Sequence, residues 1–252
     1  NANVVPAVLV GASLLPEASR QGLALSHGDP RPLATLTAHY VHGSAGHLVG
    51  NLSVYVLVVP VAYLLCLIAG RRRAFFLAFA TYLLALPPVL SVLDLALLDS
   101  GVLLGFSGVV MAFVGFLPLA IVWYANYVAG LDLDLDHAPG LFFLGIAGIS
   151  LWAVPVKPFQ LLLAGVASAA GLAYAVSARS VLDASAVTWP GAGAYVELGG
   201  AGLVAFAFGV AAGFPTVEVS NGVVVNYYGH LLGYALGFIP AYVTLRVLAP
   251  FR

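Results

Sequence analysis

The sequence has few charged residues and only one cysteine. Asp, Glu, Lys and Arg make up 8% of its 252 residues, against roughly a quarter in soluble domains. With 62% hydrophobic residues and a net charge of −1, no basic face is available for nucleic acid, and no glycine-rich loop ending in Lys-Ser or Lys-Thr indicates a nucleotide site. The lone Cys66 excludes an intramolecular disulfide and argues against a thiolate metal site. The composition predicts a polytopic membrane protein, all-α, with no cofactor.

Long apolar runs divide the chain into eight predicted membrane-spanning helices, forming a single domain over residues 1–252. A span needs roughly 20 apolar residues, and charge, proline and glycine mark its ends. The first run is shorter than this, so we expect an N-terminally truncated first helix and no signal peptide. Residues 16–31 are expected to form a polar loop with a short interfacial helix. The predicted spans are about 3–15, 42–69, 74–93, 105–128, 140–156, 158–178, 197–213 and 228–248.

The arginines predict how the helices are oriented in the membrane. Short cytoplasmic loops collect Lys and Arg, and the run 71–73 follows the second span. Placing this run inside puts six basic residues inside and three outside. We therefore expect a multi-pass membrane protein in which the second, fourth and last helices begin on the extracytoplasmic side.

Three polar clusters then lie at one depth, in the outer half of the bilayer. Gly105-Phe106-Ser107-Gly108 opens the fourth span, and His230 lies near the start of the last. His42, His47 and Asn51 lie at the start of the second span. Strongly polar residues within membrane helices usually face the protein interior and mark function. The agreement in depth requires an odd number of spans between the serine and the last histidine, and the prediction has three.

A serine paired with a histidine can form a nucleophile. We expect His230 to take the proton of the Ser107 hydroxyl, and because no carboxylate lies near either in sequence, the pair would be a dyad. The resulting oxyanion needs donors. His47 and Asn51, four residues apart, share one helix face, and the Ser107 backbone N–H at a helix N-terminus is a third donor. His42 lies off that face and could hold a water or close the outer end.

The same residues also fit roles outside catalysis. Small residues around Ser107 are typical of close helix packing, and His47 with Asn51 could bridge helices by hydrogen bonds. The cluster of His39, His42 and His47 could be imagined as a metal site, but no carboxylate or cysteine supports it, so we expect no metal. Four further ionisable residues are expected to be solvated in loops: His27, Asp94, Asp99 and His137.

Together these motifs resemble the rhomboid family of intramembrane serine proteases, in its prokaryotic form, which implies a prokaryotic cell membrane. The resemblance covers a core from about residue 35 to 245. It implies a six-helix core plus an extra helix pair, the dyad and oxyanion site described above, and transmembrane protein substrates cleaved near their outer ends. It also implies that the last helix packs tightly on the serine helix through its glycines. The matching motifs are His42-x4-His47-x3-Asn51, Gly105-x-Ser107-Gly108 with Gly115, and His230-x2-Gly233-x3-Gly237.

The chain departs from the family pattern in two ways that bear on function. The family often has an aromatic residue four positions after the serine, where this chain has Met111. The family also has one helix between the serine and histidine helices, where three are predicted here. We expect residues 197–213 to be the lateral gate for substrate and residues 214–228 to cap the site. The alternative is a catalytically inactive relative that binds membrane clients. A transporter is disfavoured, because the polar residues cluster at one depth.

Overall fold

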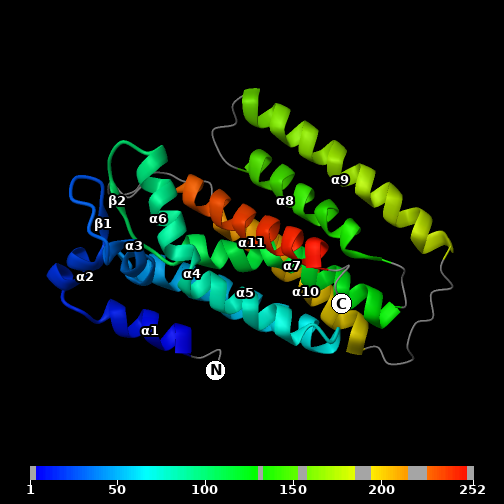
Figure 1. Ribbon diagram of the computed structural model, residues 1–252, viewed down its shortest axis with the longest axis horizontal. Helices are drawn as coiled ribbons and strands as arrows, with labels where there is room; N and C mark the ends of the chain where they lie inside the picture. The colour runs from blue at the N-terminus through cyan, green and yellow to red at the C-terminus, as the bar shows by residue number, and fades with distance from the viewer. Residues whose placement is uncertain (1–3, 130–132, 153–157, 185–193, 215–225, 249–252) are drawn as a thin grey trace.

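A computed structural model describes residues 4–129, 133–152, 158–184, 194–214 and 226–248 (Figure 1). Nearly all of these residues are helical, and the prediction of an all-α helical bundle is confirmed. Two short strands, β1 (Leu25–Ser26) and β2 (Val102–Leu103), pair antiparallel outside the bundle. The helices are α1 (Val4–Ser13), α2 (Glu17–Leu23), α3 (Ala34–Thr37), α4 (Ala45–Ile68), α5 (Arg72–Leu84), α6 (Leu86–Leu97), α7 (Ser107–Ala129), α8 (Ala138–Trp152), α9 (Pro158–Ala184), α10 (Ala194–Gly213) and α11 (Tyr227–Leu248), with 3-10 turns η1 (Ala38–Tyr40) and η2 (Leu135–His137).

Every predicted span corresponds to helical structure, but the helices differ in length and hydropathy. Four of them, α4, α7, α9 and α10, are long and apolar enough to cross a membrane. The predicted span 74–93 is a helix pair, α5 and α6, bent by 47°. The bend falls at Ala85, and Pro87 and Pro88 follow it and lack the backbone N–H that a continuous helix needs. Counting this pair once gives five candidate spans in the described chain, and a total of eight stays a prediction.

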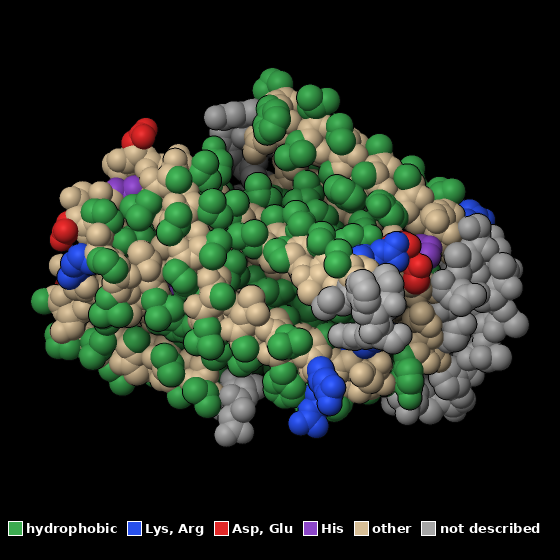
Figure 2. Space-filling view, in the orientation of Figure 1, with side chains coloured by type: hydrophobic (Ala, Val, Ile, Leu, Met, Phe, Trp, Pro, Cys, Tyr) green, Lys and Arg blue, Asp and Glu red, His purple; other side chains and the backbone are tan. Residues whose placement is uncertain are grey.

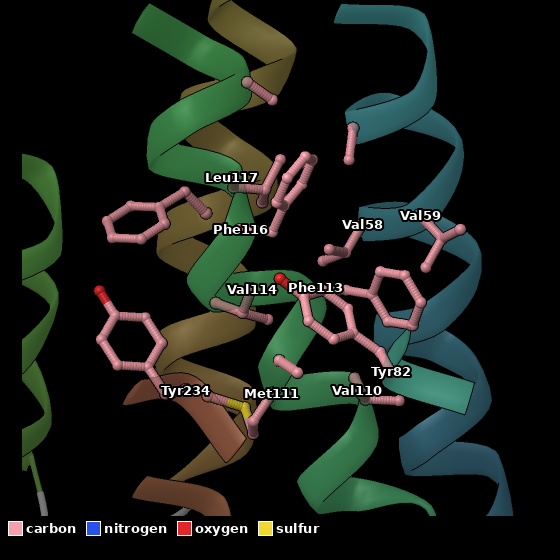
Figure 3. Close-up of a cluster of buried hydrophobic side chains, with 14 of the residues drawn as sticks. Val58, Val59, Tyr82, Val110, Met111, Phe113, Val114, Phe116, Leu117 and Tyr234 are labelled. Carbon is pink, nitrogen blue, oxygen red and sulfur yellow. The ribbon is translucent and has the colours of Figure 1, made fainter. Parts of the chain in front are cut away.

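Helix α7 lies at the centre of the bundle. In its most apolar window 89% of the residues are buried, against 44% for α4 and 17% for α9. Figure 3 shows the α7 side chains packed between α4 on one side and α11 on the other. The Phe113 ring, for example, stands edge-on to Tyr55 of α4 and Tyr82 of α5. Helix α9 is the outer member, packed against α8 (Figure 1).

Helices α7 and α11 touch backbone to backbone. A methyl group at Gly233 would overlap the Gly108 carbonyl, and one at Gly237 would overlap the Ala112 carbonyl. A methyl group at Gly115 would meet the α11 backbone in the same way. Because the contact positions advance together along both helices, α7 and α11 run parallel. Small residues allow this approach in membrane proteins, where packing rather than the hydrophobic effect holds helices together.

The helices that follow α7 dock on α11 through aromatic rings. Phe142 of α8 stacks on Tyr234 and Phe238, with ring centroids 5.1 and 4.4 Å apart. The Tyr234 hydroxyl donates to the Phe142 carbonyl at 3.0 Å. Along the described chain, three helices lie between α7 and α11 in sequence: α8, α9 and α10. The first of them contacts α11 directly.

We predict that Gly237→Ala destabilises the protein by about 1–3 kcal/mol, the usual cost of inserting a methyl group into a packed interface. Thermal unfolding in detergent measures this as a lower melting temperature. Gly200→Ala on α10 is the matched control, because nothing lies within 4 Å of its added methyl group. Equal melting temperatures for the two variants would contradict the close α7–α11 contact.

Candidate active site

Three parallel helices begin at the same end of the bundle. The backbone of Gly108, in the first turn of α7, lies against that of Gly229 in the first turn of α11. The His47 ring, from the first turn of α4, lies against Gly105 just before α7. The first backbone N–H groups of a helix have no intrahelical acceptor and carry partial positive charge. The electrostatic potential near these three N-termini therefore favours negative charge.

His42 precedes α4 and does not belong to it. The helix begins at Ala45, three residues later than the predicted start, because the Ser44 side chain caps it by accepting from the His47 N–H at 3.1 Å. Val41 and His42, which precede the cap, are buried, and the Arg20 guanidinium donates to the His42 carbonyl at 2.8 Å. The sequence-based placement of His42 on the helix is therefore wrong. Because His42 lies outside α4, its ring can contact residues of other elements.

The His42 ring joins α4 to the segment before Ser107. Asn51 Nδ2 lies 2.9 Å from His42 Nε2, and the Phe106 N–H donates to the same nitrogen at 3.4 Å. Two donors on one nitrogen require Nε2 to accept, so the proton belongs on Nδ1. Asn51, expected to face the oxyanion beside His47, thus has its amide hydrogen-bonded to His42. This bridge fixes the backbone immediately before the serine.

His47 contacts the same segment at Gly105. A side chain at Gly105 would overlap the imidazole, and Gly105 has a φ of +117°, so both contact and conformation require glycine. The His47 and His42 rings meet edge to face, with centroids 5.0 Å apart. His47 therefore lies where the start of α4 meets the segment before α7.

Ser107 and His230 lie on facing turns of α7 and α11. Ser107 is the first residue of α7 and is partly exposed, whereas His230 is buried. Their neighbours Gly108 and Gly229 are in contact. Within the described part of the chain no hydrogen bond joins the two side chains. The His230 Nδ1 lies 2.5 Å from the Gly213 carbonyl and donates to it. This bond leaves the lone pair on Nε2, the form in which imidazole acts as a base.

The imidazole of His230 is held by the end of α10. The Phe214 ring stands edge-on to it, with centroids 5.8 Å apart at 82°. Met111, which occupies the position where the rhomboid pattern has an aromatic residue, packs against Gly213, whose carbonyl accepts from His230. The sequence analysis includes Phe214 as the first residue of the predicted cap, 214–228, but does not predict its contact with the imidazole of His230.

Asp94 is buried near the end of α6, so the prediction that it is solvated in a loop is wrong. Asn226 Nδ2 donates to Asp94 Oδ1 at 2.5 Å, and His27 Nε2 lies 3.4 Å from Asp94 Oδ2. Asn226 in turn caps α11, because its Oδ1 accepts from the Gly229 N–H at 2.8 Å. Asp94 therefore links the N-terminal loop to the helix that carries His230.

The remaining histidines bond to protein groups too. His27 also bonds to the Gly101 carbonyl at 3.0 Å, and His137 bonds to Asp134 at 3.0 Å, so neither is simply solvated. His39 in η1 bonds through Nε2 to Ser91 at 3.0 Å, and its burial lowers the pKa of the imidazole to about 4. His39 is therefore neutral at pH 7. Among the residues that the structure describes, no group of three His, Cys, Asp or Glu side chains is placed to hold a metal ion.

Residues 215–225, most of the predicted cap, lie outside the described chain.

Comparison with models of protein families, with curated proteins and with solved structures found no match for this chain. Its function is therefore inferred from the site itself.

We predict that Asn226→Ala lowers stability by about 1 kcal/mol, as expected for loss of a helix cap, and that it loosens the start of α11. Hydrogen exchange at the amides of 228–230 should accelerate, while exchange in the middle of α7 stays unchanged. Asn226→Ser is the matched control, since serine keeps a capping oxygen but loses the bond to Asp94. Unchanged exchange at 228–230 in the alanine variant would refute this anchoring role.

Proposed function

We propose that this protein is an intramembrane serine protease of the rhomboid type, with Ser107 as nucleophile and His230 as general base. The observation that carries the proposal is the contact between the first turns of α7 and α11. It sets a serine at a helix N-terminus beside a buried histidine whose Nδ1 donates to Gly213. A base of fixed tautomer next to a hydroxyl is the arrangement that nucleophilic acyl transfer needs.

In the proposed reaction, Ser107 Oγ attacks the scissile carbonyl and His230 Nε2 takes its proton. His230 then gives the proton to the leaving amine, which breaks the peptide bond and leaves an acyl-enzyme. Water, deprotonated by His230, then attacks the acyl carbon. The ester bond to Ser107 breaks, His230 returns the proton to Ser107 Oγ, and the second product leaves as a carboxylic acid. Hydrogen bonds between catalytic groups are often long without substrate and tighten when it binds. The absence of a Ser107–His230 hydrogen bond in the described chain is compatible with this step.

The oxyanion would be stabilised at the junction of the helix N-termini. The Ser107 backbone N–H is in the first turn of α7 and has no intrahelical acceptor. The His47 imidazole lies next to the Gly105 backbone and can supply a second donor. Asn51 would act mainly by holding His42, unless substrate binding releases its amide from that bond.

Substrates of this enzyme would be transmembrane proteins that enter from the bilayer. Helix α10 packs on α4 and α7, and its last residues hold His230. A lateral gate between α10 and α4 would therefore lead to the dyad. The proposal includes eight spans in a prokaryotic cell membrane, with the site toward the extracytoplasmic side.

The alternative is a catalytically inactive relative that binds membrane clients. The observations that favour it are the missing Ser107–His230 hydrogen bond within the described residues and the replacement of the expected aromatic residue by Met111. The two proposals differ in one measurable property, the reactivity of Ser107.

We predict that a fluorophosphonate labels the protein in detergent and in bilayers, and that Ser107→Ala abolishes labelling. His230→Ala should slow labelling by at least about 100-fold, the usual contribution of a general base. Ser53→Ala is the control, because its hydroxyl bonds within α4 to the Val49 carbonyl, away from the site. If a folded sample reacts with neither a fluorophosphonate nor a second class of serine reagent, the client-binding alternative replaces the protease.

A second prediction concerns the gate. Gly202 of α10 faces Leu65 of α4, so cysteines at these two positions, in a Cys66→Ser background, should crosslink. We expect the crosslink to reduce cleavage of a single-span substrate while fluorophosphonate labelling continues, because only the larger substrate needs the helices to part. Unchanged cleavage would rule out a gate in which α4 and α10 separate along this contact.

A further inference from the structure

A groove of about 860 Å³ lies between α5, α6 and α11, away from Ser107 and His230. In Figure 2 this face is largely covered by hydrophobic side chains and is hollowed near its middle. The walls include Leu77 of α5, Val89 of α6 and Leu236 of α11, and Tyr82 also lines the groove. The Tyr82 hydroxyl donates to the Gly237 carbonyl at 2.5 Å, so its polar atom is already satisfied. The groove thus offers a ligand an almost wholly apolar surface.

The charged groups at the groove are all basic and lie at one end. Arg71 and Arg73 line the groove beside Gly70, where α4 ends and α5 begins, and no acidic residue lies among the described residues that line it. The Arg71 guanidinium is held 5.7 Å from the centre of the Trp123 ring. In Figure 2, arginine side chains stand at the edge of this face. This end of the groove therefore attracts an anion.

The length of the groove matches one leaflet of a bilayer. From Arg73 to Ala85, both of which line it, α5 extends about 18 Å at about 1.5 Å per residue. One leaflet contributes about 15 Å of hydrocarbon to the membrane core. An apolar groove of this length with cations at one end has the dimensions and charge of a lipid site. A phosphate bound at the arginines would leave the acyl chain of the lipid along the apolar walls.

We propose that this groove binds an anionic phospholipid, with the phosphate at Arg71 and Arg73 and one acyl chain between α5 and α11. Membrane surfaces with anionic lipids attract Lys and Arg at about 1 kcal/mol per residue, and burial of an acyl chain adds to this for each methylene group. Because the site shares no residue with the dyad, the proposal does not depend on catalysis.

The test uses the full chain in zwitterionic bilayers with a phosphatidylglycerol that carries a photoreactive diazirine in one acyl chain. We expect saturable adducts that map by mass spectrometry to α5 and α11. Unlabelled phosphatidylglycerol should displace the probe at least about fivefold better than phosphatidylcholine, which is the ratio expected for one ion pair of this kind.

Matched variants test the two parts of the site separately. Arg73→Gln should weaken binding about fivefold, whereas Arg72→Gln should not, because Arg72 lies over the Phe76 ring and does not line the groove. Ala241→Phe should remove the adducts by filling the groove, and Ala78→Phe does the same from the opposite wall if the first variant fails to fold. Any one of three results would overturn the proposal. These are equal displacement by both lipids, equal effects of the two arginine variants, and occupation of the groove between α5 and α11 by a second copy of the chain instead of by lipid.

Discussion

The backbone contact between α7 and α11 is the constraint on which the rest of the site depends. Gly233 and Gly237 meet carbonyl oxygens of α7 at a distance that leaves no room for a side chain. This contact fixes both the separation and the register of the two helices. Since Ser107 and His230 lie in the first turns of helices that run parallel, fixing the register brings them to one depth. A shift of one helical turn, about 5.4 Å, would separate them.

Around this contact, hydrogen bonds to backbone groups hold the side chains of the site. His42 accepts from Phe106, His230 donates to Gly213, and Asn226 caps α11 at Gly229. Each bond ties a polar side chain to the backbone of a different element, and Asp94 extends the last of them to the N-terminal loop. In a region of low dielectric such bonds are strong and an unpaired polar group is costly. The network therefore favours one arrangement of the helix N-termini over looser ones.

The helices and the motif positions could be predicted from the sequence because apolar length and helical spacing are local properties. The eight predicted segments all contain helix, and the three polar clusters gather at one end of the bundle. The bend at Ala85, the role of Phe214 and the burial of Asp94 could not be predicted in this way. Asp94 and Asn226 are 132 residues apart in the chain, and only the fold shows that the carboxylate reaches a helix cap. Spacing alone places His42 on α4, whereas the Ser44 cap starts the helix after it.

Helix α11 takes part in both the candidate active site and the apolar groove, because its faces have different partners. One face carries glycines against α7, and another carries Leu236, Ala241 and Leu245 along the apolar groove. Tyr82 contacts both faces of α11, since it lines the groove and its hydroxyl donates to the Gly237 carbonyl. A group that fills the groove therefore packs against the same helix that positions His230. Since the groove and the candidate active site share no residue, each can be altered by separate substitutions, although both depend on the position of α11.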